Sequence, residues 1–232
     1  MDIAGAFMPL VDLFFPKLCI ACEEESYAGD IPVCVKCLVD LPLADMDPHK
    51  DNLITERLYG RFPIQSSAAL LYFTKKSKTQ HLIHHAKYSG DPYISRILGN
   101  WLGERLLAEK NYTIPDVIVP VPLHDSKMST RGYNQSQEFG QGLAEIFQIN
   151  CIGNALKRTQ ASISQTTKNR MDRLENVHSS FDLYKTDGIV NKHILLVDDV
   201  LTTGATIEAC AEKLLTLPNT KISICLMAIV IE

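Results

Sequence analysis

The chain has 232 residues, of which 46% are hydrophobic, so it can bury a sizeable core, and its length allows one domain or two. Its formal net charge of −4 argues against a surface that coats nucleic acid. We therefore expect a soluble, cytoplasmic protein.

Residues 1–18 are apolar enough to raise the question of a membrane segment. Asp2 and Asp12 interrupt the apolar run, no basic stretch precedes it, and it is too short to span a bilayer. An amphipathic helix or an extended arm that packs against the body of the protein is expected here, with no membrane span.

Four cysteines follow as two CxxC pairs. Cys19 and Cys22 form the first pair, and Cys34 and Cys37 form the second. Two such pairs can close around one tetrahedral ion, and Zn2+ is the usual metal for four thiolates. Because four thiolates leave no open coordination position, the zinc would be structural. The alternatives are four unrelated thiols or a redox pair.

The elements expected in the first half come from turn residues and from apolar spacing. Proline and aspartate between 38 and 63 predict a connector of turns with one short helical piece. After it, apolar periodicity predicts a strand at 68–73 and helices at 78–88 and 92–109. The first helix carries His81, His84 and His85 at a spacing that could suit a metal. No carboxylate or cysteine adjoins them in the sequence, so a solvated helix face is the favoured interpretation.

The second half alternates strands and helices. The patterns predict a strand at 117–119, a proline-marked loop to about Thr130, a helix at 134–149, a strand at 151–157, a basic polar segment at 158–178, a short strand at 181–184 and a last strand at 221–231. This alternation is typical of a parallel sheet with helices on both faces.

The most informative segment begins with a continuous apolar run at 194–197, the pattern of a strand buried on both faces. Asp198 and Asp199 come next, followed by a loop of small residues that opens a helix. Backbone N–H groups at such a helix start favour a phosphate monoester, and the carboxylates could hold ribose hydroxyls. Gly204 is expected to be needed because a side chain there would crowd the phosphate or strain the turn. The alternative is an ordinary strand, turn and capped helix.

The segment 197–206 resembles the signature of type-I phosphoribosyltransferases, which bind phosphoribosyl pyrophosphate. With the two CxxC pairs, the chain resembles ComF/GntX-type proteins, which couple an N-terminal zinc ribbon to a phosphoribosyltransferase-like domain. Further matching residues lie at 13–18, 87–90, 119–124 and 131–135, and at Gln165, Arg173, Asn176 and Phe181. The chain departs at its end, where many members have an arginine and this chain has Ile231 and Glu232.

The resemblance implies an α/β fold with a type-I phosphoribosyltransferase-like parallel sheet flanked by helices and a small N-terminal zinc ribbon. The domains expected are a ribbon with its N-terminal arm at 1–45, a connector at 46–65 and a phosphoribosyltransferase-like domain at 66–232.

The resemblance also implies the site. Asp198 and Asp199 would be the catalytic pair, holding ribose hydroxyls and stabilising positive charge at the anomeric carbon. The expected 5-phosphate cradle is Leu201, Thr202, Thr203, Gly204, Ala205 and Thr206. Lys87, Arg131 and Arg173 are the expected phosphate and pyrophosphate contacts, with Arg131 placed where a helix begins. The alternative for Arg131 is a cap or salt bridge.

The reaction implied is displacement of pyrophosphate from C1 of the ribose, with Mg2+ arriving on the donor, and it needs no protein nucleophile. No motif indicates the acceptor. Two classes stay open: a phosphoribosyltransferase, or a phosphoribosyl-binding module that serves DNA uptake in natural competence through a protein partner. Strong direct binding of nucleic acid by the ribbon is not expected, because between Cys19 and Cys37 Tyr27 is the only aromatic residue and four acids outweigh Lys36.

Overall fold

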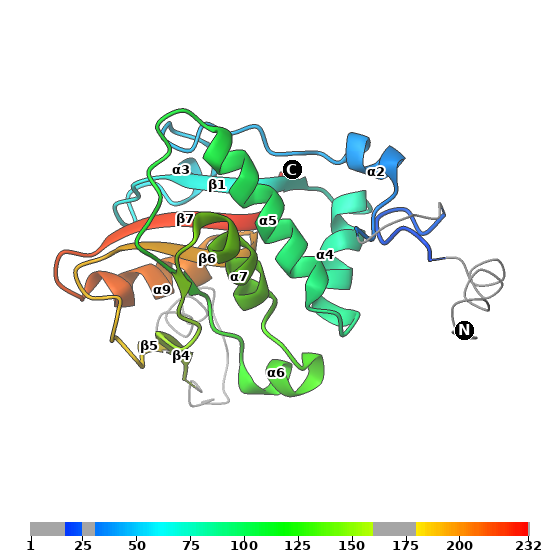
Figure 1. Ribbon diagram of the computed structural model, residues 1–232. Coiled ribbons are helices and arrows are strands. Elements are labelled where there is room, and N and C mark those ends of the chain that lie inside the picture. The colour runs from blue at the N-terminus through cyan, green and yellow to red at the C-terminus, as the bar shows by residue number, and fades with distance from the viewer. Residues whose placement is uncertain (1–16, 25–30, 160–179, 232) are drawn as a thin grey trace, which may run out of the picture.

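The computed structural model describes residues 17–24, 31–159 and 180–231 (Figure 1). A five-stranded sheet forms the centre. Its spatial order is β1 (Ser67–Phe73), β7 (Lys221–Val230), β6 (His193–Leu201), β2 (Val117–Pro120) and β3 (Asn150–Cys151). All the pairings in this sheet are parallel, so the predicted α/β class with a parallel sheet is confirmed.

Strand β6 lies at the middle of the sheet. Leu196 is paired with Val119 of β2 on one side and with Ile224 of β7 on the other. This position explains the continuous apolar run, because both faces of a central parallel strand are covered. The strand is longer than the apolar run predicts: it continues through both aspartates to Leu201, which still pairs with Ile229.

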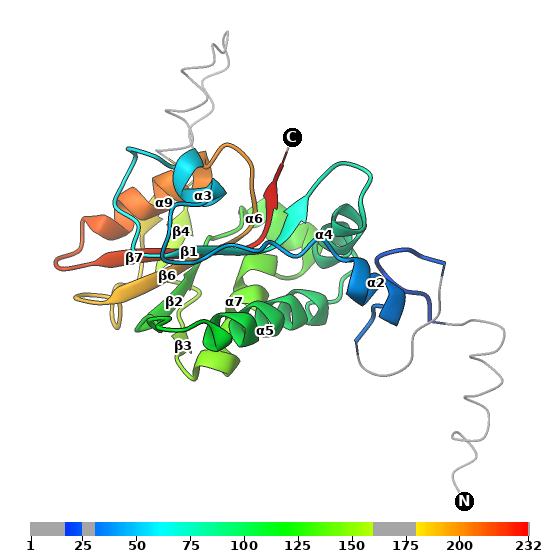
Figure 2. The ribbon, with the colours of Figure 1, turned by 90° about the horizontal axis from the view of Figure 1, so that it is seen from above.

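Helices cover both faces of the sheet. On one side lie α4 (Lys78–Tyr88), α5 (Tyr93–Ala108) and α7 (Gln135–Phe147), and on the other lie α3 (Leu53–Arg57) and α9 (Ala205–Leu215). Figure 2 shows α3 and α9 opposite α5 and α7 across the sheet. The second side also carries an antiparallel pair, β4 (Leu156–Arg158) and β5 (Phe181–Leu183). Two hydrophobic clusters result, one on each face.

Two elements differ from the expected ones. The predicted loop to Thr130 contains helix α6 (Asp125–Arg131), which buries no side chain and therefore leaves no apolar period in the sequence. The predicted strand 151–157 is two short strands, β3 and β4, in different sheets. A turn at 153–154 separates them.

The cysteine-rich segment packs against the main body. It contains helix α2 (Val35–Asp40), and Cys34 and Cys37 share a hydrophobic cluster with Leu82 of α4 and Leu98 of α5. The described part of this segment therefore buries some of its surface on the same helices that cover one face of the sheet. Among the described residues, no helix has both the length and the apolar content needed to cross a membrane.

Candidate functional site

The two aspartates lie near the carboxyl end of β6, where the first turn of α7 reaches them. Ser136 Oγ donates to Asp198 Oδ1 at 2.9 Å, and the Asp199 backbone N–H donates to the same oxygen at 2.9 Å. Loss of solvation, and then the charge of Asp199, raises the pKa of Asp198 to about 7. The hydrogen bonds act in the opposite direction but are outweighed, so Asp198 can change protonation near neutral pH.

Asp199 is held by two donors from different helices. Gln135 Nε2 donates to its Oδ2 at 2.7 Å, and Lys87 Nζ forms an ion pair with the same oxygen at 2.8 Å. Both ionic side chains are largely shielded from solvent, with 22% of Lys87 and 13% of Asp199 exposed. Shielding strengthens the pair relative to one on the open surface.

Arg131 joins this network through Gln135. Its Nη1 donates to Gln135 Oε1 at 2.9 Å, its Nη2 donates to the Tyr88 hydroxyl at 3.2 Å, and its guanidinium lies 4.8 Å from the centre of the Tyr88 ring. A continuous polar chain therefore runs from Arg131 through Gln135 and Asp199 to Lys87. Arg131 was expected where a helix begins, but it is the last residue of helix α6. The next helix, α7, begins at Gln135.

The small-residue loop lies beside Asp198. One small pocket is lined by Asp198, Val200, Leu201, Thr202, Thr203, Gly204, Ala205, Thr206 and Ile207. Gly204 is the N-cap of α9 with a left-handed φ of 85° and makes no side-chain cap. The Ala205 N–H lies 3.5 Å from Thr203 Oγ1, at the long limit of a hydrogen bond, so the start of α9 can still offer N–H groups to a bound anion.

Gly204 has a further packing constraint. A Cβ there would lie 2.5 Å from Leu58 Cδ2 and 3.3 Å from Arg61 Nη1. Leu58 is fully buried, so it has little room to move. The structure gives glycine a reason beyond the expected one: the left-handed turn and contact with the segment after α3 require it before any phosphate is considered.

Helix α3 and the residues after it hold the 202–206 loop in place through Arg57 and Arg61, a role that sequence reasoning missed. Arg57 donates to the carbonyl oxygens of Leu201 at 3.2 Å and of Val230 at 2.8 Å. Arg61 pairs with Glu208 in the first turn of α9 at 2.8 Å. The segment expected to be a connector thus holds the ends of β6 and β7 and the start of α9 together.

Gln135, Ser136 and Tyr88 are also site residues that sequence reasoning did not assign. Two of them, Tyr88 and Gln135, stand inside the motif segments 87–90 and 131–135, so their proximity to Lys87 and Arg131 was the available signal. Arg173 and the greater part of the 158–178 segment lie outside the described residues.

The four cysteines of the two CxxC pairs come together. Their sulfur atoms all lie within 4.8 Å of one another, and none is in a disulfide. The N–H groups of Ala21 and Cys37 donate to the sulfurs of Cys19 and Cys34, each at 3.4 Å. Zn–S bonds of about 2.3 Å place tetrahedral sulfurs about 3.8 Å apart, so the set could hold one zinc ion.

Burial and the neighbouring thiols raise the pKa of Cys37 to about 12. Without a cation this thiol stays protonated at neutral pH, and a bound metal would supply the charge that stabilises the thiolate.

No protein-family model matches the chain. Among solved structures, adenine phosphoribosyltransferase from Leishmania tarentolae is 11% identical at a TM-score of 0.38, covering 81% of this chain and 94% of that one. Purine phosphoribosyltransferase from Pyrococcus horikoshii is 18% identical at 0.35, covering 68% and 77%. These scores are low, and the fold assignment rests on the strand order described above.

Curated relatives match more than half of the chain. Competence protein F of Haemophilus influenzae is 30% identical over 137 residues, which are 57% of this chain and 60% of that protein. DNA utilization protein YhgH of Escherichia coli K12 is 33% identical over 58% and 60%. Competence protein ComFC of Streptococcus pneumoniae is 32% identical over 59% and 56%. The chain thus spans about 60% or less of the length of these relatives, and over that part its expected resemblance to ComF-type proteins is confirmed.

Proposed function

We propose that this protein binds phosphoribosyl pyrophosphate with Mg2+ and transfers the phosphoribosyl group to an acceptor. The observation that carries the proposal is the convergence at the end of β6. Asp198 lines a pocket with the loop that opens α9, and Asp199 meets Lys87 directly and Arg131 through Gln135. Groups suited to binding an anion and groups suited to stabilising a cation thus lie side by side.

The 5-phosphate of the donor would lie on the N–H groups of the 202–206 loop and the start of α9, with the threonine hydroxyls as further donors. The ribose would then face the aspartates, whose oxygens accept from its hydroxyls. Asp199 forms an ion pair with Lys87, so a donor that reaches this place would have a cation beside it.

The reaction would break the bond between C1 and the pyrophosphate oxygen. Positive charge develops at C1, where the carboxylates stabilise it, and negative charge develops on the leaving group, where Lys87 and Arg131 stabilise it. Mg2+ bound to the donor would neutralise further pyrophosphate charge, keeping several waters and using few protein ligands such as the aspartate oxygens. The new bond forms between C1 and the acceptor.

A second candidate is a phosphoribosyl-binding module that works in DNA uptake through a protein partner. It is favoured by the names of the relatives, which refer to competence and to DNA utilization and to no enzymatic reaction. Such a module would keep the donor pocket and lack turnover.

Calorimetry with phosphoribosyl pyrophosphate and Mg2+ tests the proposal, followed by a pyrophosphate-release assay across nucleobases and amines. We expect the natural protein to bind phosphoribosyl pyrophosphate and to release pyrophosphate with one class of acceptor. The double variant Asp198→Asn, Asp199→Asn should lose binding while remaining folded. Binding without release from any acceptor would favour the module, and absence of binding would reject both candidates.

A further inference from the structure

The two aspartates at the end of β6 differ in how much of each carboxylate is free. Asp199 Oδ2 accepts from Gln135 Nε2 at 2.7 Å and pairs with Lys87 Nζ at 2.8 Å. Its Oδ1 accepts from the backbone N–H of Val200 at 2.5 Å. A carboxylate offers about four acceptor positions, and three donors already occupy those of Asp199. With 13% of its side chain exposed, Asp199 has little room for a further partner.

Asp198 has the opposite arrangement. Both of its hydrogen bonds, from Ser136 Oγ and from the Asp199 backbone N–H, go to Oδ1, each at 2.9 Å. Its Oδ2 has no hydrogen-bond partner in the described part of the chain. Asp198 also lines the pocket of the 202–206 loop, and Asp199 does not. A sugar whose phosphate lies on that loop therefore meets a free oxygen of Asp198 first.

Lys87 gains a fixed position from its pair with Asp199. The helix that carries it, α4, is packed against one face of the sheet. A lysine in open solvent samples many rotamers, and ordering it when a ligand binds weakens the binding. The carboxylate has already ordered this lysine, of which 22% is exposed. Gln135 links the same carboxylate to Arg131, so two cations are held in place for a second anionic group.

A ribose hydroxyl at Asp199 Oδ2 would have to displace Lys87 or Gln135. In place of Lys87, it would replace an interaction between two charges by one between a charge and a neutral group. In place of Gln135, it would leave the amide of a buried side chain without its acceptor. Neither exchange is favourable, so the contacts favour an Asp199 that keeps both donors while the ligand is bound.

We propose that the two aspartates have separate tasks. Asp198 contacts the ribose, and Asp199 is a positioning residue that holds Lys87 where the pyrophosphate of the donor lies. This inference rests on the proposed function and adds its specificity. The pair of Asp199 and Lys87 makes the site prefer phosphoribosyl pyrophosphate to ribose 5-phosphate, because only the first ligand carries the group that Lys87 contacts.

Calorimetry of the full chain with both ligands, each with Mg2+, tests the assignment. The measured quantity is the ratio of the affinity for phosphoribosyl pyrophosphate to the affinity for ribose 5-phosphate. Asp199→Asn and Lys87→Met should each lower this ratio at least about tenfold, the usual effect of losing one hydrogen bond to a charged group. Asp198→Asn should weaken both ligands by similar factors, because the ribose is common to them.

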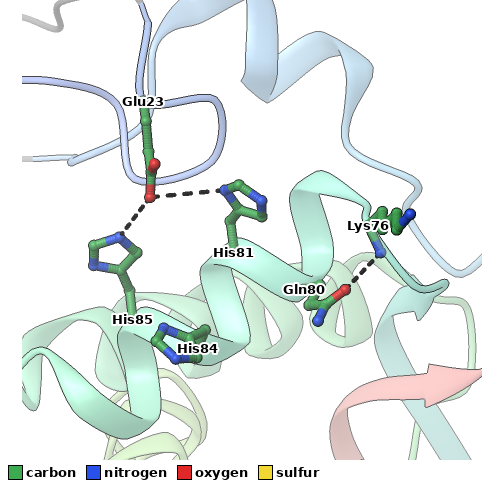
Figure 3. A pocket seen from close by; sticks show the side chains of 6 residues that line it. All are labelled: Glu23, Lys76, Gln80, His81, His84 and His85. Atoms are coloured by element: carbon green, nitrogen blue, oxygen red, sulfur yellow. Dashed lines mark hydrogen bonds and ion pairs between the residues drawn. The ribbon is translucent and has the colours of Figure 1, made fainter.

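A double variant separates positioning from a second direct contact. If Asp199 acts through Lys87, combining Asp199→Asn with Lys87→Met lowers the ratio no further than either change alone. Lys76→Met is the matched control, since it also removes one lysine charge. Lys76 precedes the start of α4, whereas Lys87 lies near its end. Lys76 lines a different pocket, beside Gln80 and His81 (Figure 3), so its loss should leave the ratio unchanged.

Equal weakening of both ligands in Asp199→Asn would overturn the assignment, because Asp199 would then contact the ribose. A double variant whose ratio falls by the product of the two single effects would also overturn it. Thermal unfolding checks each variant, and Lys87→Met decides the matter if Asp199→Asn does not fold. If the natural chain binds neither ligand, the proposed function itself fails. If it binds both and Lys87→Met keeps the natural ratio, this inference alone is rejected.

Discussion

Asp198 occupies a position where its charge is costly. Its pKa is raised from an ordinary value of 3.8 to about 7, first by loss of solvation and then by Asp199. Because the folded state holds this proton more tightly than the unfolded chain, the stabilisation is complete below pH 3.8 and is lost as pH rises through about 7. The carboxylate that would accept a hydrogen bond from a ribose hydroxyl therefore destabilises the free protein at alkaline pH.

The variant Asp198→Asn should accordingly melt at a higher temperature than the natural protein at pH 8. At pH 5 the difference should shrink, since Asp198 is then protonated and resembles asparagine in charge. Thermal unfolding at both pH values measures this. The control Asp182→Asn removes a carboxyl whose side chain is exposed on β5, and an equal difference for Asp198→Asn at both pH values would contradict the account.

Gly204 offers a second prediction about a single residue. Gly204→Ala should lower the free energy of unfolding by roughly 2–5 kcal/mol, combining a left-handed backbone cost of about 1–2 kcal/mol with an overpacking cost of about 1–3 kcal/mol against Leu58. Urea unfolding gives the value. In the Leu58→Ala background the overpacking part should disappear. If the cost is the same in both backgrounds, Leu58 is not the neighbour that matters.

At the scale of elements, the first turn of α7 organises the site. Gln135 connects Arg131 with Asp199, and Ser136 supports Asp198, so one helix start sets the positions of three charged side chains. The close packing of α7 on α5 fixes this start, because a Cβ at Gly142 would lie 2.1 Å from the Arg96 carbonyl oxygen.

Gln135→Met should therefore weaken binding of phosphoribosyl pyrophosphate at least about tenfold, since each hydrogen bond to a charged group contributes about 1.5–3 kcal/mol. Calorimetry with Mg2+ measures the change. Gln141→Met, further along the same helix, serves as the control and should bind normally. Unchanged affinity in Gln135→Met would mean that Arg131 and Asp199 find their positions without this bridge.

The buried elements could be predicted from the sequence because a helix or strand that packs on the core shows a regular spacing of apolar residues. The helix at 78–88 and the strands at 68–73 and 221–231 match the observed elements to within a residue. Helix α6 could not be predicted this way, since it buries nothing, and the extension of β6 through Asp198 depends on pairing with β7, which no local pattern records. Likewise, the local motif indicated the aspartates and the loop, whereas the contacts of Arg57 and Leu58 arise from long-range packing.

At the scale of the molecule, the described part of the cysteine-rich segment belongs to one of the two hydrophobic clusters. Cys34 and Cys37 pack in the same cluster as Leu82 and Leu98, while the segment after α3 packs on the opposite face under the loop. The division into a ribbon at 1–45, a connector at 46–65 and a domain at 66–232 stays a prediction.

We propose that the four cysteines hold one zinc ion, and the shared cluster leads us to expect that Cys34→Ser lowers the stability of the whole chain and abolishes zinc binding. Metal binding and ribbon folding are coupled in small cysteine sites, so loss of the ion exposes the surface that α4 and α5 bury. Metal analysis and thermal unfolding check both effects. Cys210→Ser, in the other cluster, should keep its zinc. A Cys34→Ser variant with full zinc content would contradict the assignment.

The most direct measurement of the central claim is a calorimetric titration of ribose 5-phosphate into three proteins. The natural chain and Thr216→Ala, changed at the far end of α9, should bind it equally. Thr203→Ala should bind more weakly by roughly 1–3 kcal/mol, the contribution of one charge-assisted hydrogen bond in the loop. Equal affinity in all three would place the phosphate elsewhere, and no binding by the natural chain would contradict a phosphosugar site at the end of β6.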